Sequence, residues 1–140
     1  MKIDRRGVLA IGGSLACTSI VPFKALASSE IDEAIAQFTG GADIGTGGIK
    51  LTTPEIAENG NTVPISVQGA KATSILILAL GNPNPNVARI NFGPLAGSRT
   101  TSTRIRLRKT QDVVAIAKLE DGNFTKDTKK VKVTIGGCGG

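Results

Sequence analysis

Apolar and polar residues alternate along most of the chain after residue 60, which is the pattern of β-strands with one buried face. Near the C-terminus, for example, Val131, Val133 and Ile135 alternate with polar side chains. Residues 73–80 instead form a continuous apolar run, which predicts a central strand buried on both faces. The strands predicted in this way cover residues 46–51, 62–68, 73–80, 87–92, 101–107, 112–119 and 128–135.

Turn-forming residues separate these strands at short intervals. An Asn-Gly pair predicts a tight reversal within residues 57–61, and asparagines alternating with prolines predict a loop over residues 81–86. Asp, Gly and Asn at residues 121–123 predict another turn. Pro64 lacks a backbone N–H, so it places its strand at a sheet edge or marks the beginning of a strand.

Residues 28–38 have a different period, which predicts one short helix. Ile31, Ala34, Ile35 and Phe38 recur at helical spacing and form one apolar stripe. Serine at the beginning can cap this helix, and acidic residues in its first turn suit the helix dipole. Two glycines follow the stripe and end the helix.

About seven short strands in 140 residues predict a single all-β domain. A parallel α/β sheet is disfavoured because no helix alternates with the strands. The strand count and the turn spacing are typical of an immunoglobulin-like antiparallel β-sandwich. We therefore expect such a sandwich, with a short N-terminal helix and a flexible C-terminal tail.

The N-terminal segment has the features of an export signal. Arg5 and Arg6 precede an apolar, glycine-interrupted run over residues 8–21, and Ala25-Leu26-Ala27 supplies small residues for a signal peptidase. The run is too short and too rich in glycine to span a bilayer comfortably. Paired arginines favour the twin-arginine route, although Val8 departs from the usual motif. We expect residues 1–27 to be cleaved and the protein to be periplasmic.

Cys17 lies inside this signal. It could carry the lipid of a lipoprotein, but that processing site requires a large aliphatic residue three positions earlier, where this chain has Ser14. We therefore expect no membrane anchor, and Cys138 is the cysteine that the mature chain keeps. A lone cysteine in an oxidising compartment is buried, paired with another molecule or reactive.

Charge and composition exclude several classes of function. The net charge is +6, but residues 1–27 hold four of the 17 basic and one of the 11 acidic residues, which leaves about +3. That charge is too weak to indicate a nucleic-acid partner. The chain contains no histidine, the commonest general base and metal ligand. We expect neither a metal nor another cofactor.

Three groups of polar residues are weak candidates for chemistry. The Arg104, Arg106 and Arg108 stripe could meet an anionic partner, although the polar face of one exposed strand explains it as well. The glycine-rich segment 45–48 lacks the lysine of a phosphate loop and is better interpreted as a turn. Carboxylates near predicted turns have no metal-loop spacing and are best interpreted as solvated surface. They are Glu55, Glu58, Asp112, Glu120 and Asp121.

The C-terminal tail is the strongest candidate site. Cys138 lies among four glycines, Gly136, Gly137, Gly139 and Gly140, after the last predicted strand. Glycine has the widest backbone freedom, so this segment should stay mobile and leave the sulfur accessible. An ordinary thiol has a pKa near 8.5, and no residue in the segment would lower it. Cys138 therefore suits covalent attachment of a substrate better than catalysis with a base of its own.

These features resemble the SoxY family, the sulfur-carrying subunits of the bacterial Sox thiosulfate-oxidising system. The resemblance rests on the export signal, the segment 54–60 followed by Val63-Pro64, and above all the ending over residues 133–140. It implies an immunoglobulin-like sandwich, a heterodimer with SoxZ, and sulfur intermediates carried on Cys138. It also implies separate enzymes: the haem protein SoxXA, the dimanganese hydrolase SoxB and, in many organisms, a sulfane dehydrogenase.

The expected division is thus a signal peptide (1–27), a sulfur-carrier domain (28–135) and a carrier arm (136–140). The chain would be a carrier and not an enzyme. One alternative is a non-catalytic immunoglobulin-like assembly domain that forms an intermolecular disulfide through Cys138. Another is a ubiquitin-like carrier using Gly139-Gly140 as a thiocarboxylate. That chemistry needs ATP, which an exported protein lacks.

Overall fold

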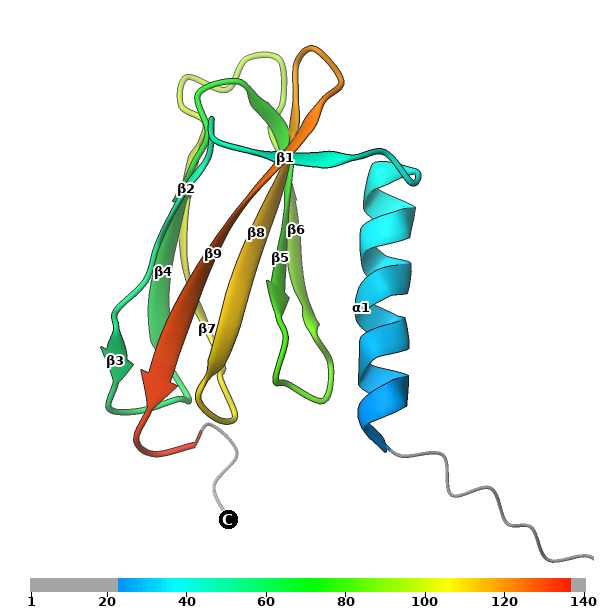
Figure 1. Cartoon of the computed structure of the whole chain (residues 1–140). Coiled ribbons are helices and arrows are strands. Elements are labelled where there is room, and N and C mark those ends of the chain that lie inside the picture. Colours follow the sequence, from blue (N-terminus) through cyan, green and yellow to red (C-terminus); the bar gives the residue numbers. More distant parts are fainter. Residues whose placement is uncertain (1–22, 137–140) are drawn as a thin grey trace, which may run out of the picture.

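The computed structural model describes the backbone of residues 23–136 and the side chains of residues 28–136. Within residues 23–136, helix α1 (Phe23–Thr39) is followed by nine strands that form two packed sheets (Figure 1). The strands are β1 (Ile44–Thr46), β2 (Lys50–Thr52), β3 (Ile56–Ala57), β4 (Val63–Gln68), β5 (Ala72–Ala79), β6 (Asn86–Asn91), β7 (Thr100–Ile105), β8 (Gln111–Leu119) and β9 (Phe124–Val133).

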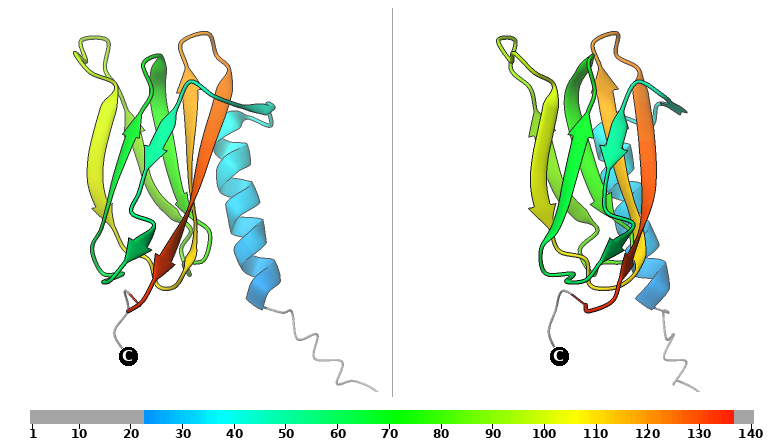
Figure 2. Two further views of the ribbon diagram at one scale, coloured as in Figure 1. Left: turned by 60° about the vertical axis from the view of Figure 1, so that its left-hand side comes forward. Right: turned by 90° about the vertical axis from the view of Figure 1, so that its left-hand side faces the viewer.

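The larger sheet has the order β1-β9-β8-β5-β6, and the smaller sheet has the order β2-β4-β7. Long neighbours pair antiparallel, as predicted, whereas the short strands β1 and β3 both pair parallel with β9. The two views in Figure 2 show the smaller sheet on one side of the larger sheet and α1 on the other. The architecture is the all-β immunoglobulin-like sandwich expected from the strand pattern.

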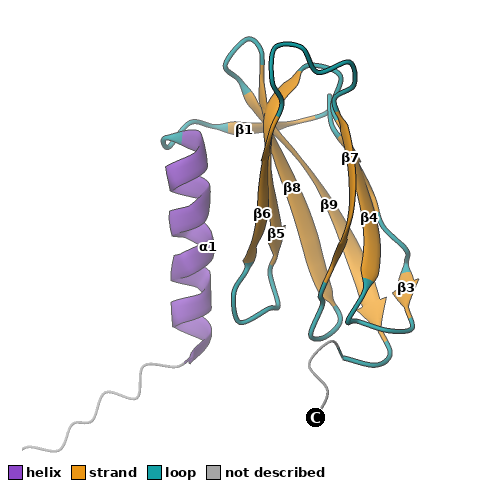
Figure 3. Cartoon of the chain, turned by 180° about the vertical axis from the view of Figure 1, so that it is seen from behind, coloured by secondary structure: helices purple, strands orange, loops and turns teal. Residues whose placement is uncertain are grey.

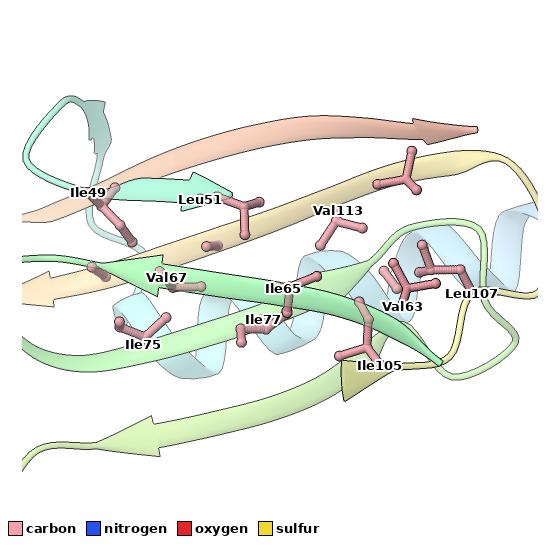
Figure 4. Close-up of a cluster of buried hydrophobic side chains, with 14 of the residues drawn as sticks. Ile49, Leu51, Val63, Ile65, Val67, Ile75, Ile77, Ile105, Leu107 and Val113 are labelled. Carbon is pink, nitrogen blue, oxygen red and sulfur yellow. The ribbon is translucent and has the colours of Figure 1, made fainter. Parts of the chain in front are cut away.

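Strand β5 is buried on both faces, as its apolar run predicted. Ile75 and Ile77 face the interior of the sandwich, where they meet the apolar side chains of β4 (Figure 4). Leu76 and Leu78 face the opposite way and pack in the cluster that contains Phe38 of α1. Burying a side chain of this size contributes about 1.5–3 kcal/mol, so both faces of β5 stabilise the fold.

Helix α1 covers the outer face of the larger sheet (Figure 2). The rings of Phe38 and Phe124 meet edge to face with centroids 5.7 Å apart, and the guanidinium of Arg89 lies 5.1 Å from the centre of the Phe38 ring. The helix ends at Thr39, before Gly40 with its positive φ of 65°. Within residues 23–136, no helix is long and apolar enough to cross a membrane.

The helix begins at Phe23, five residues before its predicted start. Residues 23–27 contain alanine, leucine and lysine, which favour helix even without an apolar stripe. The proposed cleavage position after Ala27 falls inside α1, and cleavage there stays a prediction.

Two strand predictions were wrong in detail. The single strand expected at residues 46–51 is two strands in different sheets, because Gly47 and Gly48 adopt positive φ angles of 92° and 79° and turn the chain. Of segment 45–48, predicted as a turn, Gly47 and Gly48 do turn the chain, whereas Gly45 and Thr46 belong to β1. Strand β9 begins at Phe124, not at residue 128, since its first half is largely polar and is held by pairing with β8.

Pro64 lies at an edge only locally. β4 is central in its sheet, but β2 pairs with it no farther than Ser66, so Pro64 has β7 alone as a neighbour. The missing N–H of proline therefore leaves no acceptor unpaired on the open side. Because β2 is short, Pro64 has one open side although β4 is the central strand of its sheet.

Candidate functional site

The predicted arm leaves the sandwich at the end of β9. Gly136 is the last described residue, while Gly137, Cys138, Gly139 and Gly140 lie outside the described residues. Figure 3 shows that the end of β9, the β7–β8 loop and the loop after β3 lie at the same end of the sandwich. We call residues 132–136, which are the end of β9 and the three residues after it, the arm root. The contacts of the arm root are the part of the candidate site that the structure describes.

Backbone hydrogen bonds hold the arm root on one side. The Lys132 N–H donates to the carbonyl of Glu55 at 2.9 Å, and the Thr134 N–H donates to the carbonyl of Ala57 at 3.1 Å. The Gly60 N–H then donates to the Ile135 carbonyl at 2.8 Å. The two-residue strand β3, which the sequence analysis missed, thus begins an attachment that continues to residue 135.

The side chain of Thr110 holds the other side. β8 begins at Gln111, whose partner is Val131, so the backbone ladder ends before the arm root. The Thr110 hydroxyl extends it: it accepts from the Val133 N–H at 2.9 Å and donates to the Val133 carbonyl at 3.4 Å. A hydroxyl can do both at once. A side chain therefore replaces the missing rung of the ladder.

Gly136 is required for close packing. A Cβ atom built at this residue would lie 2.5 Å from the carbonyl oxygen of Arg108, a distance that real Cβ atoms do not reach. The contact is with backbone, which cannot rotate away as a long side chain would. The sequence predicts that Gly136 belongs to the mobile arm, but in the structure this glycine has a steric role. Mobility of residues 136–140 stays a prediction.

Replacing Gly136 with alanine is expected to destabilise the protein by about 1–2 kcal/mol, because the new methyl group must displace either the Arg108 carbonyl or the arm root. Chemical denaturation measures the change. Gly139→Ala is the matched control, since it makes the same substitution in the predicted arm, and we expect its unfolding free energy to stay within about 0.5 kcal/mol of the parent chain. Equal stability of the two variants would contradict the steric role of Gly136.

The β7–β8 loop beside Gly136 is held by Asn82. The Asn82 side-chain amide donates to the Arg106 carbonyl at 2.7 Å, and its oxygen accepts from the Arg108 N–H at 3.0 Å. The buried side chain of Gln111 also donates to the Asn82 oxygen, at 2.9 Å. These bonds hold the loop backbone against which Gly136 packs.

The three arginines do not form one stripe on a strand. Arg104 lies in β7 opposite Pro64, but β7 ends at Ile105 and places Arg106 and Arg108 in the loop at the arm root. All three side chains are exposed, as is Lys109. Ion pairs among the described residues are Arg99 with Glu120 and Lys129 with Asp127, so these four cations have no carboxylate partner within residues 28–136.

The five candidate carboxylates are not brought together. Glu55 and Glu58 flank the arm root, whereas Glu120 and Asp121 lie at the β8–β9 hairpin at the opposite end of β9. Hydrogen bonds from Asn123 to its carboxylate lower the pKa of Asp121, because they stabilise the ionised form. No group of three acidic or cysteine side chains within the described part of the chain could hold a metal ion.

An open groove of about 600 Å³ lies beside the exposed face of β4 and β7. Its lining includes Pro54, Pro64, Ser66, Ser102 and Arg104. Strand periodicity gave no signal for it, because it lies beyond the point where β2 ends. Arg104 is the charged residue of its lining, so the groove offers no acid–base pair.

Comparisons with known proteins agree with this architecture. Residues 35–138 match the family described as sulfur oxidation protein SoxY. The structure is similar to that of the sulfur carrier protein SoxY from Chlorobium limicola f thiosulfatophilum, with 35% identity and a TM-score of 0.66, covering 77% of this chain and 99% of that chain. No curated protein matches the chain.

Two more distant structures share the fold alone. Superoxide reductase (neelaredoxin) from Ignicoccus hospitalis has 20% identity and a TM-score of 0.54, and the match covers 63% of this chain and 81% of that chain. A hypothetical protein from Pyrococcus horikoshii OT3 has 13% identity and a TM-score of 0.52, with 69% and 98% covered.

Proposed function

This chain belongs to the SoxY family of sulfur oxidation proteins, and from that premise we propose that it carries sulfur intermediates covalently on the thiol of Cys138. The observation that supports this most is the extent of the family match, which runs through the whole β-sandwich and reaches Cys138. The hydrogen-bonded arm root adds support, since it gives the residues after Gly136 a fixed point of attachment.

The proposed chemistry begins with coupling of thiosulfate to the thiol. The outer sulfur of thiosulfate forms a disulfide bond with Sγ of Cys138, while the thiol proton and two electrons leave. The electrons pass to the haem of SoxXA. Hydrolysis by SoxB then adds one water, releases sulfate and two protons, and leaves a deprotonated persulfide on Cys138. A sulfane dehydrogenase would oxidise this remaining sulfur in hosts that possess one.

In this scheme the protein holds the substrate and its partners perform each reaction. The sequence contains no histidine, so in this proposal the partners supply the general acid–base chemistry. Tethering keeps the intermediate at a high effective concentration for each visiting enzyme. We propose that the working form is a heterodimer with SoxZ, without a cofactor of its own.

We also propose that the protein acts in the periplasm after export by the twin-arginine route. Arg5-Arg6, the short apolar run and Ala25-Leu26-Ala27 support this location. N-terminal sequencing of the protein isolated from the periplasm would test it: a mature chain that begins near Ser28 is expected, and a chain that retains Met1 would contradict cleavage.

Intact-mass analysis tests the carrier function. The chain incubated with thiosulfate, SoxXA and an electron acceptor is expected to gain one thiosulfate-derived group, and SoxB should then reduce the added mass to one sulfur atom. Cys138→Ser should gain neither. An unchanged adduct on the serine variant would contradict attachment at Cys138. A stable disulfide-linked dimer as the working form would favour the assembly-domain alternative, and non-reducing gels of freshly isolated protein would reveal it.

A further inference from the structure

We propose that Arg106, Arg108 and Lys109 form an anion-binding surface at the arm root, which holds the sulfonate end of a sulfur cargo carried on Cys138. The inference rests on the proposed carrier function and adds a recognition element within the same chain. It follows from the position of the β7–β8 loop, the charge of its side chains and the short covalent distance to the thiol.

The position of the loop is fixed relative to the arm. Gly136 packs directly against the Arg108 carbonyl, and Asn82 hydrogen-bonds the backbone at both Arg106 and Arg108. The loop and the end of β9 lie at one end of the sandwich (Figure 3). The three cations are therefore anchored where the arm begins, whatever conformation the arm itself adopts.

These cations are also available to an anion. Arg106, Arg108 and Lys109 are exposed, and none forms an ion pair within residues 28–136. Glu55, Glu58 and Lys132 also lie at the arm root, with a combined charge of about −1, so the three cations of the loop leave the charge there positive. Guanidinium groups bind oxyanions through paired N–H donors, which suits the three oxygens of a sulfonate.

The thiol is held within reach by covalent geometry. Only Gly137 lies between Gly136 and Cys138, so the Cα atoms of Gly136 and Cys138 are at most about 7 Å apart. That distance is shorter than the Debye length of about 10 Å at 0.1 M salt. Thiosulfate is a dianion, and its adduct on the thiol ends in a sulfonate. Such a group on this tether meets the loop at a high effective concentration, so even a weak anion site would hold it.

The test uses the full chain with Cys17→Ser, in which Cys138 is the remaining thiol. Two methanethiosulfonate reagents of similar size and opposite charge, sulfonatoethyl and trimethylammonioethyl, each form a disulfide with this thiol. The loop variant carries three substitutions, Arg106→Gln, Arg108→Gln and Lys109→Gln. In this variant, the rate of the sulfonatoethyl reagent divided by the rate of the trimethylammonioethyl reagent should fall by about three- to tenfold. This difference should disappear in 1 M salt.

A matched variant removes the same charge elsewhere. Lys71, Lys118 and Lys126 are exposed near the β8–β9 hairpin, and replacing all three with glutamine should leave the rate ratio nearly unchanged. An equal fall in both triple variants would overturn the proposal, since net charge would then explain the result. An unchanged ratio in the loop variant together with weaker SoxXA binding would also overturn it, and would assign the cations to a protein interface.

Binding of the tethered anion has a second readout that needs no loop variant. In NMR spectra, the sulfonatoethyl adduct should shift the amide and guanidinium signals of residues 106–109, whereas the trimethylammonioethyl adduct should not. Equal shifts from the two adducts would overturn the proposal. Neither reagent needs Sox chemistry, so failure of this test is distinct from failure of thiosulfate coupling at Cys138.

Discussion

The Cys138→Ser variant is expected to lose thiosulfate-dependent sulfate formation in the reconstituted pathway, by at least about a hundredfold. The serine hydroxyl is of similar size, but its oxygen is a poor nucleophile at neutral pH and cannot form the disulfide and persulfide intermediates of the scheme. Its unfolding free energy should match that of the parent chain, because the substitution lies beyond the packed arm root. Sulfate release over time is the measurement.

Cys17→Ser is the matched control for that variant. It makes the same substitution at the other cysteine of the chain, inside the predicted signal peptide, and it should leave both export and activity unchanged. If Cys138→Ser retains activity while Cys17→Ser loses it, our scheme assigns the sulfur to the wrong cysteine. If both variants are active, covalent carriage on this chain is wrong altogether.

The fold could be predicted because its main signal is periodic. Alternation in β4 and the unbroken apolar run of β5 follow directly from which faces are buried, and the structure confirms both. The first half of β9 was not predicted because the polar residues after Phe124 carry no apolar period. Its backbone pairs with β8 regardless of side-chain type, and no pattern in a single strand records a partner far along the chain.

Of the candidate site, the sequence could predict the cysteine and its glycine neighbours but not the contacts of the arm root. Cys138 among glycines is legible in the sequence, but the arm root depends on contacts between segments far apart in the chain. Thr110 bonds Val133 across 23 residues, and Gly60 bonds Ile135 across a longer separation. Gly136 shows the difficulty most clearly. The neighbouring glycines in the sequence indicate a flexible backbone, whereas in the structure the Arg108 carbonyl leaves no room for a side chain at residue 136.

Gln111 hydrogen-bonds the two loops beside the arm root, and its replacement by leucine is the most informative test of how the arm root is held. Gln111 is 6% exposed. The side-chain oxygen accepts from the Gly81 N–H at 2.7 Å, while the amide donates to Asn82 at 2.9 Å and to the Lys109 carbonyl at 3.0 Å. Leucine has a similar volume but leaves three polar groups without these partners.

Gln111→Leu is therefore expected to lower the unfolding free energy by about 2–4 kcal/mol, because three part-buried hydrogen bonds are lost at once; each lost partner costs up to about 1–3 kcal/mol, of which water recovers part. Gln68→Leu is the matched control: the side chain is exposed on β4, and a change within about 0.5 kcal/mol is expected. Hydrogen exchange should also quicken at the Arg108 amide in Gln111→Leu alone, since Asn82 loses one of the hydrogen bonds that orient it. Similar stabilities for both variants, or unchanged exchange at Arg108, would mean that the loop under Gly136 is held by other contacts.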